Sequence, residues 1–258
     1  MHPVKVSCVS YINSAPYIYG LRKLESSGVI ILSLDNPSEC AAKLRLGSVD
    51  IGLVPVAAIA SIKNATYITD WCIGADGPVK SVTLLSEVPL REIKSILLDF
   101  QSVSSNILTR VLAANFWNIN PEFCESQNGL EQEISGSRAG VIIGDRSLQQ
   151  QHKFKYVYDL AEEWKKFTGL PFVFARWVST KNLSSEFALQ FNEALSFGIQ
   201  HMDDVIVSLK ALPEYQPGTD SYLLNNLSYH FDAAKKRGME LYLEYAASLT
   251  ESEVRELQ

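Results

Sequence analysis

The sequence of 258 residues lacks any apolar run close to the ~18–20 residues that a helix needs to cross a bilayer. It also lacks an excess of basic residues, because 23 Lys and Arg stand against 29 Asp and Glu, and the formal net charge is −6. Neutralising a nucleic-acid backbone requires clustered Lys and Arg. We therefore expect neither a membrane nor nucleic acid among the partners. A small anion is compatible with this charge, because it responds to the local field.

The cysteines show no CxxC spacing and no nearby histidine, which argues against a zinc site or a disulfide framework. We interpret all four as buried free thiols: Cys8, Cys40, Cys72 and Cys124. The basic segment and apolar stretch of a secretory signal are also missing, since the chain passes from Met-His-Pro directly into a strand-like run at Val4–Val9. We therefore expect a cytoplasmic protein.

The common catalytic signatures are absent as well. There is no GxSxG nucleophile elbow, no P-loop, no GxGxxG fingerprint and no HExxH pair. The four histidines are scattered along the chain, and we interpret them as surface or structural residues: His2, His152, His201 and His230. We expect no metal and no cofactor.

Strand-like and helix-like segments alternate through the first two thirds of the chain, which predicts an α/β fold with mainly parallel sheets. The predicted strands lie at 29–34, 50–54, 81–86, 95–99, 139–143 and 172–178. Helices are predicted at 38–46, where Ser38 would be the N-cap, and at 104–117. The last third is mostly helical, roughly at 183–201, 203–212, 220–227, 231–249 and 251–257.

The length suits one large domain or two small ones. Pro89 follows a predicted strand and marks a crossing between two lobes, and a return crossing is expected near 174–177. We therefore predict a discontinuous lobe of residues 1–88 and 175–258, an inserted lobe of residues 89–174, and a ligand cleft between them.

Ligands of open α/β sheets bind beyond the carboxyl ends of the strands. After the predicted strand at 95–99, three serines fall within four residues, at Ser102, Ser104 and Ser105. A single serine suffices as a helix N-cap. Several hydroxyls beside free backbone N–H groups and the positive end of a helix dipole would instead form an anion cradle. The segment alone does not decide between a cap and a cradle.

The segment 10–16 is a second candidate cradle, in which Asn13 offers two donors and one acceptor. Two such cradles would suit a small molecule with two carboxylates. Asp145 is the best-placed carboxylate, either as a helix N-cap or as a catalytic base. The bulky segment 159–172 indicates core packing, except that the hydroxyl of Thr168 and the backbone of Gly169 could face the cleft.

Six stretches follow one another in an order that is typical of a known family. They are Val9–Pro16 (VSYINSAP), Gly47–Pro55 (GSVDIGLVP), Asp76–Val82 (DGPVKSV), Ser102–Ser105 (SVSS), Ile143–Asp145 (IGD) and Asp159–Ala175, which ends in TGLPFVFA. The sequence resembles the chorismate dehydratase family of the futalosine route to menaquinone over about its first 180 residues. Two departures are mild: Ser104 stands where the family often has Thr, and Ser14-Ala15 replaces variable residues.

The resemblance implies a type II periplasmic-binding-protein fold of two α/β lobes, used as a cytoplasmic enzyme. It implies a cofactor-independent carbon–oxygen lyase (a hydro-lyase) that dehydrates chorismate, a dianion, to 3-[(1-carboxyvinyl)oxy]benzoate. The implied catalytic residues are Asn13, which would orient the substrate, and Asp145. The implied substrate-binding residues are Tyr11, Ser14, Ser81, Ser102, Ser104, Ser105, Gly144, Thr168 and Gly169.

Two alternatives stay open at this point. One is a non-catalytic cytoplasmic binding protein for a small dicarboxylate, since the implied fold is best known in solute receptors. The other is the related naphthoate-forming enzyme of the same pathway, although its opening motif differs from the segment 10–16 and a catalytic His is expected nearby. The proton acceptor (Asp145, water or a substrate carboxylate) and the choice between monomer and homodimer are also open.

Overall fold

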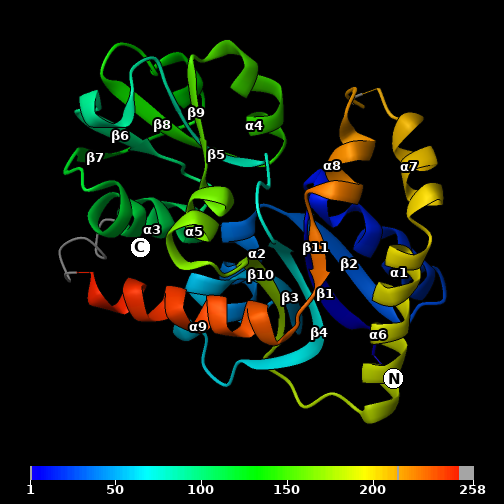
Figure 1. The fold of residues 1–258 in the computed structure, drawn as a ribbon. Coiled ribbons are helices and arrows are strands. Elements are labelled where there is room, and N and C mark those ends of the chain that lie inside the picture. Colours follow the sequence, from blue (N-terminus) through cyan, green and yellow to red (C-terminus); the bar gives the residue numbers. More distant parts are fainter. Residues whose placement is uncertain (1, 214, 250–258) are drawn as a thin grey trace. The chain divides into compact units, whose positions relative to one another are not determined.

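The computed structural model describes residues 2–213 and 215–249, and the chain divides into two compact units (Figure 1). Unit 1 consists of Met1–Ile73 and Ala175–Phe231, and unit 2 consists of Gly74–Phe174 and Asp232–Gln258. Both units are α/β, and each is built around its own sheet. No helix in the described part of the chain combines the length and apolar character that a membrane span requires.

Unit 1 is built on a six-stranded sheet with the order β11-β4-β10-β3-β1-β2. Its strands are β1 (Val4–Val9), β2 (Ile30–Asp35), β3 (Ile51–Pro55), β4 (Thr66–Ala75), β10 (Phe172–Ser179) and β11 (Ser228–His230). β1 pairs in parallel with β2 and β3, whereas β10 runs antiparallel to β3. The helices are η1 (Ile12–Ser14), α1 (Ala15–Ser26), α2 (Pro37–Arg45), η2 (Val56–Ser61), α6 (Ser185–Gln200), α7 (Met202–Lys210) and α8 (Thr219–Asn225).

Unit 2 is built on a five-stranded sheet with the order β7-β6-β8-β5-β9. Its strands are β5 (Val82–Ser86), β6 (Ser95–Leu98), β7 (Glu122–Glu125), β8 (Arg138–Ile143) and β9 (Tyr156–Asp159). The helices are η3 (Leu90–Glu92), α3 (Val103–Leu112), η4 (Ala113–Trp117), η5 (Leu130–Gln132), α4 (Asp145–Gln150), η6 (Gln151–Lys153), α5 (Leu160–Thr168) and α9 (Ala233–Ser248).

The directions of these five strands concentrate polar segments at one edge of the sheet. β6 is parallel to β7 and β8, and β5 is antiparallel to both β8 and β9. The carboxyl ends of β6, β7, β8 and β9 therefore share an edge with the start of β5. We call this the polar edge of unit 2.

The predicted division into lobes is wrong in two places. Residues 74–88 belong to unit 2, because β5 lies between β8 and β9 in its sheet. The helix α9 also belongs to unit 2, where it lies beside α3 (Figure 1). The Tyr242 hydroxyl donates to Ser104 O at 2.9 Å, and the Tyr242 ring meets Trp164 edge-on. The chain leaves unit 1 within β4 rather than at Pro89, whereas its return at 174/175 coincides with the expected crossing.

Several local predictions also need correction. Both sheets are mixed rather than mainly parallel, and β4, β7, β9 and β11 were not predicted. Helix α2 is capped by Asn36 rather than Ser38, in a capping box with Glu39. The predicted helix at 251–257 lies outside the described residues. The prediction of free thiols is confirmed, with Cys8, Cys40 and Cys72 buried and Cys124 half-buried.

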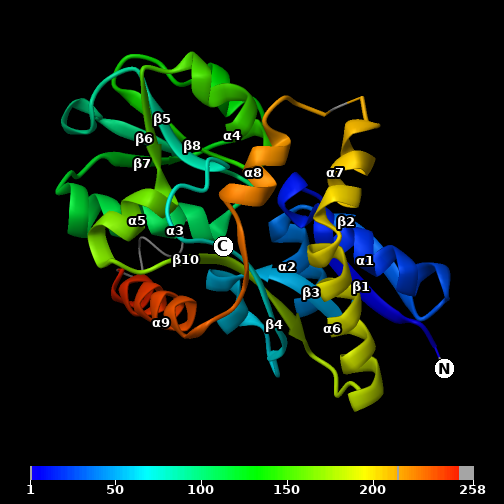
Figure 2. The same cartoon turned by 45° about the vertical axis from the view of Figure 1, so that its right-hand side comes forward.

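Within unit 1, α1 lies against α6 with almost no space between the two backbones (Figures 1 and 2). A Cβ added at Gly20 would lie 1.8 Å from Ala194 O, and one added at Gly198 would lie 1.7 Å from Pro16 O. Glycine is required at both positions because any side chain would overlap a carbonyl oxygen. This contact holds the start of α1, and α1 directly follows the segment that contains Asn13.

We expect Gly198→Ala to destabilise the protein by about 1–3 kcal/mol, because the new methyl group would force the helices apart. An alanine in the interior of a helix ordinarily stabilises it by up to ~1 kcal/mol relative to glycine, so the sign of the effect is diagnostic. Urea unfolding followed by circular dichroism measures it. Glu193→Ala, at an exposed position of the same helix, is the control. A Gly198→Ala protein as stable as the wild type would contradict the close contact.

Candidate functional site

The polar edge of unit 2 brings together residues that are far apart in the sequence. Ser81 precedes β5 and Gly144 follows β8, and the Gly144 N–H donates to Ser81 O at 2.7 Å. The segment Asp99–Ser105 follows β6, the strand next to β8. Six of the residues singled out in the sequence thus lie at this one edge: Ser81, Ser102, Ser104, Ser105, Gly144 and Asp145.

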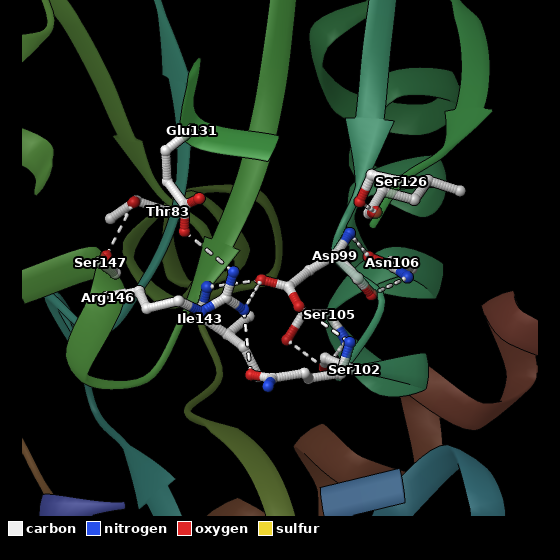
Figure 3. A network of polar contacts seen from close by, with 12 residues as sticks. Thr83, Asp99, Ser102, Ser105, Asn106, Ser126, Glu131, Ile143, Arg146 and Ser147 are labelled. Carbon is white, nitrogen blue, oxygen red and sulfur yellow. Dashed lines mark hydrogen bonds and ion pairs between the residues drawn. The ribbon is translucent and has the colours of Figure 1, made fainter. Parts of the chain in front are cut away.

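Two of the three serines at the start of α3, Ser102 and Ser105, hydrogen-bond to each other. Ser102 is the N-cap, and its Oγ accepts from the backbone N–H of Ser105 at 3.1 Å. The Ser102 hydroxyl in turn donates to Ser105 Oγ at 2.8 Å (Figure 3). All three serines are buried, with exposed fractions of 2–7%. The capping interpretation therefore holds for Ser102. The Ser105 hydroxyl accepts from Ser102, which leaves its own hydrogen to donate elsewhere.

An ion pair that no local sequence pattern predicts crosses the polar edge. Asp99, with no exposed surface, accepts from Arg146 Nη2 at 2.6 Å, and Arg146 Nη1 also contacts Glu131 Oε1 at 3.0 Å. Figure 3 shows the Arg146 guanidinium between these two carboxylates. Arg146 Nη2 additionally donates to Gln101 Oε1 at 3.1 Å. The sequence feature that could have indicated this pair is a carboxylate, Asp99, and a guanidinium, Arg146, near the ends of two predicted strands.

The Asp99 carboxylate is also held by backbone groups. It accepts from the N–H of Gln101 at 2.9 Å and from that of Ile143 at 3.1 Å. Burial raises the pKa of Asp99, and the Arg146 guanidinium and these N–H groups only partly offset that effect. The contact to Gln101 is local, whereas the contacts to Ile143 and Arg146 join Asp99 to residues more than 40 positions away.

Gly144 and Asp145 form the turn between β8 and α4. Gly144 has φ +64° and is the N-cap, a backbone conformation that favours glycine. Asp145 is therefore the first residue of α4 rather than its cap, and its side chain is half-buried. A carboxylate in the first turn of a helix is favourable because it faces the positive end of the helix dipole.

Asp159, at the end of β9, ties α5 to the segment before Ser81. Its Oδ1 accepts from the N–H groups of Ala161 and Glu162, both at 3.1 Å, and its Oδ2 accepts from the Lys80 N–H at 2.5 Å. Lys80 has φ +63°, which is rare for a long side chain. Burial raises the pKa of Asp159, although these N–H groups lower it. The backbone next to Ser81 is therefore tightly constrained.

Thr168 and Gly169 are not connected to this network. Thr168 is the last residue of α5; its hydroxyl donates to Trp164 O at 2.9 Å and accepts from the Leu170 N–H at 3.1 Å. Gly169 has φ +74° and is the C-cap, with its N–H donating to Lys165 O. The observed hydrogen bonds of both residues therefore belong to the C-terminal end of α5.

In unit 1, Tyr11, Asn13 and Ser14 lie together between β1 and α1. The buried Ser14 hydroxyl donates to Asn13 Oδ1 at 3.1 Å, and the Ser14 N–H donates to Tyr11 O at 2.9 Å. Tyr229, from β11, donates its hydroxyl to Asn13 O at 3.0 Å. Asn13 is half-buried and held through its backbone and its amide oxygen, so its NH₂ group is the part suited to donate to a ligand.

A second polar cluster supports the same region of unit 1. Asp35 Oδ2 accepts from the hydroxyls of Ser7 at 2.7 Å and Ser33 at 2.6 Å, and Asp35 Oδ1 contacts Lys43 Nζ at 2.5 Å. Burial raises the pKa of Asp35, but these hydrogen bonds outweigh it and hold the pKa below its usual range. The backbone oxygen of Asp35 accepts from the Ser10 N–H, which anchors the start of the loop that contains Asn13.

Other candidate sites are less informative. A cavity of about 410 Å³ in unit 1 contains none of the residues expected to bind substrate; among those that line it are His2, Gly28, Asn182 and Phe187. Within residues 2–213 and 215–249, no group of three or more His, Cys, Asp and Glu side chains is arranged to hold a metal ion.

Residues 4–248 match the model of a family described as menaquinone biosynthesis, and the chain belongs to this family. The chorismate dehydratase of Thermus thermophilus is 25% identical over 264 residues, which cover 95% of each protein.

Two solved structures superpose on nearly the whole chain and identify its fold. A protein from Archaeoglobus fulgidus superposes with a TM-score of 0.75 at 15% identity, covering 96% of this chain and 97% of the other. A Candida albicans protein described as having the generic periplasmic binding protein fold superposes with a TM-score of 0.63 at 12% identity, covering 100% of this chain and 94% of the other. The predicted periplasmic-binding-protein-like α/β fold is therefore confirmed.

Proposed function

We propose that this protein is a chorismate dehydratase, a cytoplasmic hydro-lyase that acts without a cofactor in menaquinone biosynthesis. The observation that carries the proposal is the polar edge of unit 2, where serine hydroxyls and backbone N–H groups gather at the start of α3 and beside Gly144. Membership of the menaquinone biosynthesis family and similarity to a chorismate dehydratase support the assignment of the substrate.

Chorismate carries two carboxylates, and uncharged donors can bind them. Helix α3 has ten residues, so its dipole places a partial positive charge at the segment Ser102–Ser105. A hydrogen bond to a charged group contributes about 1.5–3 kcal/mol. In this proposal Ser81, Ser104 and Ser105 bind carboxylates, and Gly144 lines the site.

The reaction removes one ring proton and the ring hydroxyl of chorismate, which together leave as water, and the product ring becomes aromatic. Because aromatisation supplies much of the driving force, the tasks of the enzyme are positioning and proton handling. Asn13 orients or polarises the reacting part of the substrate; it is not a base, because an amide does not titrate near neutral pH. The proton acceptors to be compared are Asp145, water and a carboxylate of the substrate, and Asp145→Asn removes only the first.

A second candidate function is non-catalytic binding of a small dicarboxylate. It is favoured by the fold, which the chain has in common with a protein described as having the periplasmic binding protein fold. Binding and catalysis would use the same donors, so a turnover measurement is needed to separate the two functions.

The deciding experiment is to incubate the purified protein with chorismate and follow formation of the aromatic product by ultraviolet absorbance and mass spectrometry. We expect turnover after extensive dialysis against a chelator, because the proposed mechanism uses no metal. Tight binding of chorismate without product would reject the enzyme and favour the binding protein. Absence of both would reject chorismate as the ligand.

Asn13→Asp should lower kcat at least ~100-fold with little change in the melting temperature. The aspartate keeps the shape and the oxygen that accepts from Ser14, but it replaces the NH₂ donor by a negatively charged oxygen. Steady-state kinetics and thermal unfolding measure the two effects. Asn182→Asp, on the segment before α6, is the control for an added charge. Wild-type kcat in Asn13→Asp would remove Asn13 from the mechanism.

Ser105→Ala should raise KM about 10- to 100-fold, because it removes a donor worth about 1.5–3 kcal/mol to a bound carboxylate. It also removes the acceptor of the Ser102 hydroxyl, so a loss of stability of about 1 kcal/mol should accompany the raised KM. Ser102→Ala is the matched comparison, since it removes the cap of α3 and should lower the free energy of unfolding by ~1 kcal/mol. If Ser105→Ala instead loses stability with an unchanged KM, its hydroxyl is structural.

A further inference from the structure

The Asp99–Arg146 ion pair joins the two turns that carry the proposed substrate-binding groups of unit 2. Asp99 is the first residue of the turn between β6 and α3, and Arg146 is the second residue of α4, which follows β8. Their side chains meet at 2.6 Å, and the Ile143 N–H donates to the same carboxylate oxygen at 3.1 Å. A single oxygen of Asp99 is thus bonded both to the end of β8 and to the helix that follows it.

The backbone of Asp99 is hydrogen-bonded to α3. The Asn106 side chain, on the first turns of α3, accepts from the Asp99 N–H and donates to Asp99 O, both at 2.9 Å (Figure 3). Asp99 Oδ1 accepts from the Gln101 N–H at 2.9 Å, just before the serines. Asp99 is therefore held by α3 through its backbone and by the β8–α4 turn through its side chain.

The charges around Arg146 argue against a direct role in binding an anion. Its guanidinium contacts two carboxylates, those of Asp99 and Glu131, so the three side chains together have a formal charge of −1. Its Nη2 also donates to Gln101 Oε1, and its side chain is only 24% exposed. A substrate carboxylate would meet a net negative cluster here, whereas the start of α3 offers uncharged donors.

We propose that Asp99 and Arg146 form a positioning pair, which sets the distance and orientation between the Ser102–Ser105 segment and the Gly144-Asp145 turn. This inference rests on the proposed function, because it takes these two segments to act on one substrate. Neither residue touches the substrate. Each acts through the donors that it holds, and a misplacement of such donors by ~1 Å can cost about 100-fold in rate.

A double-mutant cycle of Asp99→Asn and Arg146→Gln tests the pair. We expect each variant to lower kcat/KM about 100-fold and the double variant to lower it by no more than that, because either change breaks the same connection. Independent contributions would multiply to about 10,000-fold, and that result would overturn the proposal. So would a raised KM in Arg146→Gln with wild-type kinetics in Asp99→Asn, which would identify Arg146 as a direct ligand of the substrate.

Two further variants separate positioning from general stability. Arg146→Lys keeps the charge but lacks the planar guanidinium that contacts Asp99, Gln101 and Glu131 together. On a logarithmic scale, we therefore expect Arg146→Lys to recover less than half of the kcat/KM that Arg146→Gln loses. Arg138→Gln breaks the exposed pair with Glu133 at the opposite end of β8 and should leave the kinetics unchanged. Wild-type kcat/KM in Arg146→Lys would show that the guanidinium geometry is not required, and would contradict the proposed positioning role.

Amide hydrogen exchange provides a readout that does not need chorismate. In Arg146→Gln, peptides covering 99–106 should exchange at least several-fold faster than in the wild type, whereas in Arg138→Gln they should not. If the wild type does not convert chorismate but Arg146→Gln still exchanges faster over 99–106, the proposed function is rejected and the positioning pair is retained. If the wild type converts chorismate and Arg146→Gln changes neither rate nor exchange, the pair is rejected. If Asp99→Asn does not fold, the Arg146 and Arg138 variants still decide the question.

Discussion

A buried carboxylate needs a partner, and in unit 2 this requirement links the elements of the polar edge. Asp99 has no exposed surface, and leaving its charge uncompensated would cost several kcal/mol. Compensation comes from Arg146 and from the backbone of Ile143, which belong to the turn after the neighbouring strand. The end of β6, the start of α3 and the β8–α4 turn are therefore held together by one residue, Asp99, through its backbone and its side chain.

The same arrangement explains how a protein with a net charge of −6 can be suited to an anionic ligand. At the polar edge the Arg146 guanidinium is occupied by two carboxylates, so its charge stabilises the scaffold. In the proposed function the donors for a ligand are uncharged, such as the Ser105 hydroxyl and backbone N–H groups at a helix start, whose positive potential comes from aligned peptide dipoles. Such donors add no net charge, which makes overall charge a poor guide to what the protein binds.

Local sequence patterns predicted the strands β5, β6 and β8 and the helix α3 closely, because burial on both faces produces short continuous apolar runs and caps mark their ends. They also located Ser81, Ser105 and Gly144 at strand ends. They missed β4, whose ten residues mix exposed and buried positions without a regular alternation. They indicated only that the Thr168 hydroxyl could face the cleft, and its observed hydrogen bonds are to Trp164 and Leu170 at the end of α5.

The sequence by itself determined the α/β class, the polar composition of the strand ends and the resemblance to one family. These follow from the chemistry of neighbouring residues, since capping and periodicity extend over only a few positions. The tertiary structure alone decided that α9 packs in unit 2, that β5 lies between β8 and β9, and that Asp99 pairs with a guanidinium 47 positions away. The reason is that the order of strands in the sheet determines which strand ends are neighbours, and this order depends on contacts between residues far apart in the sequence.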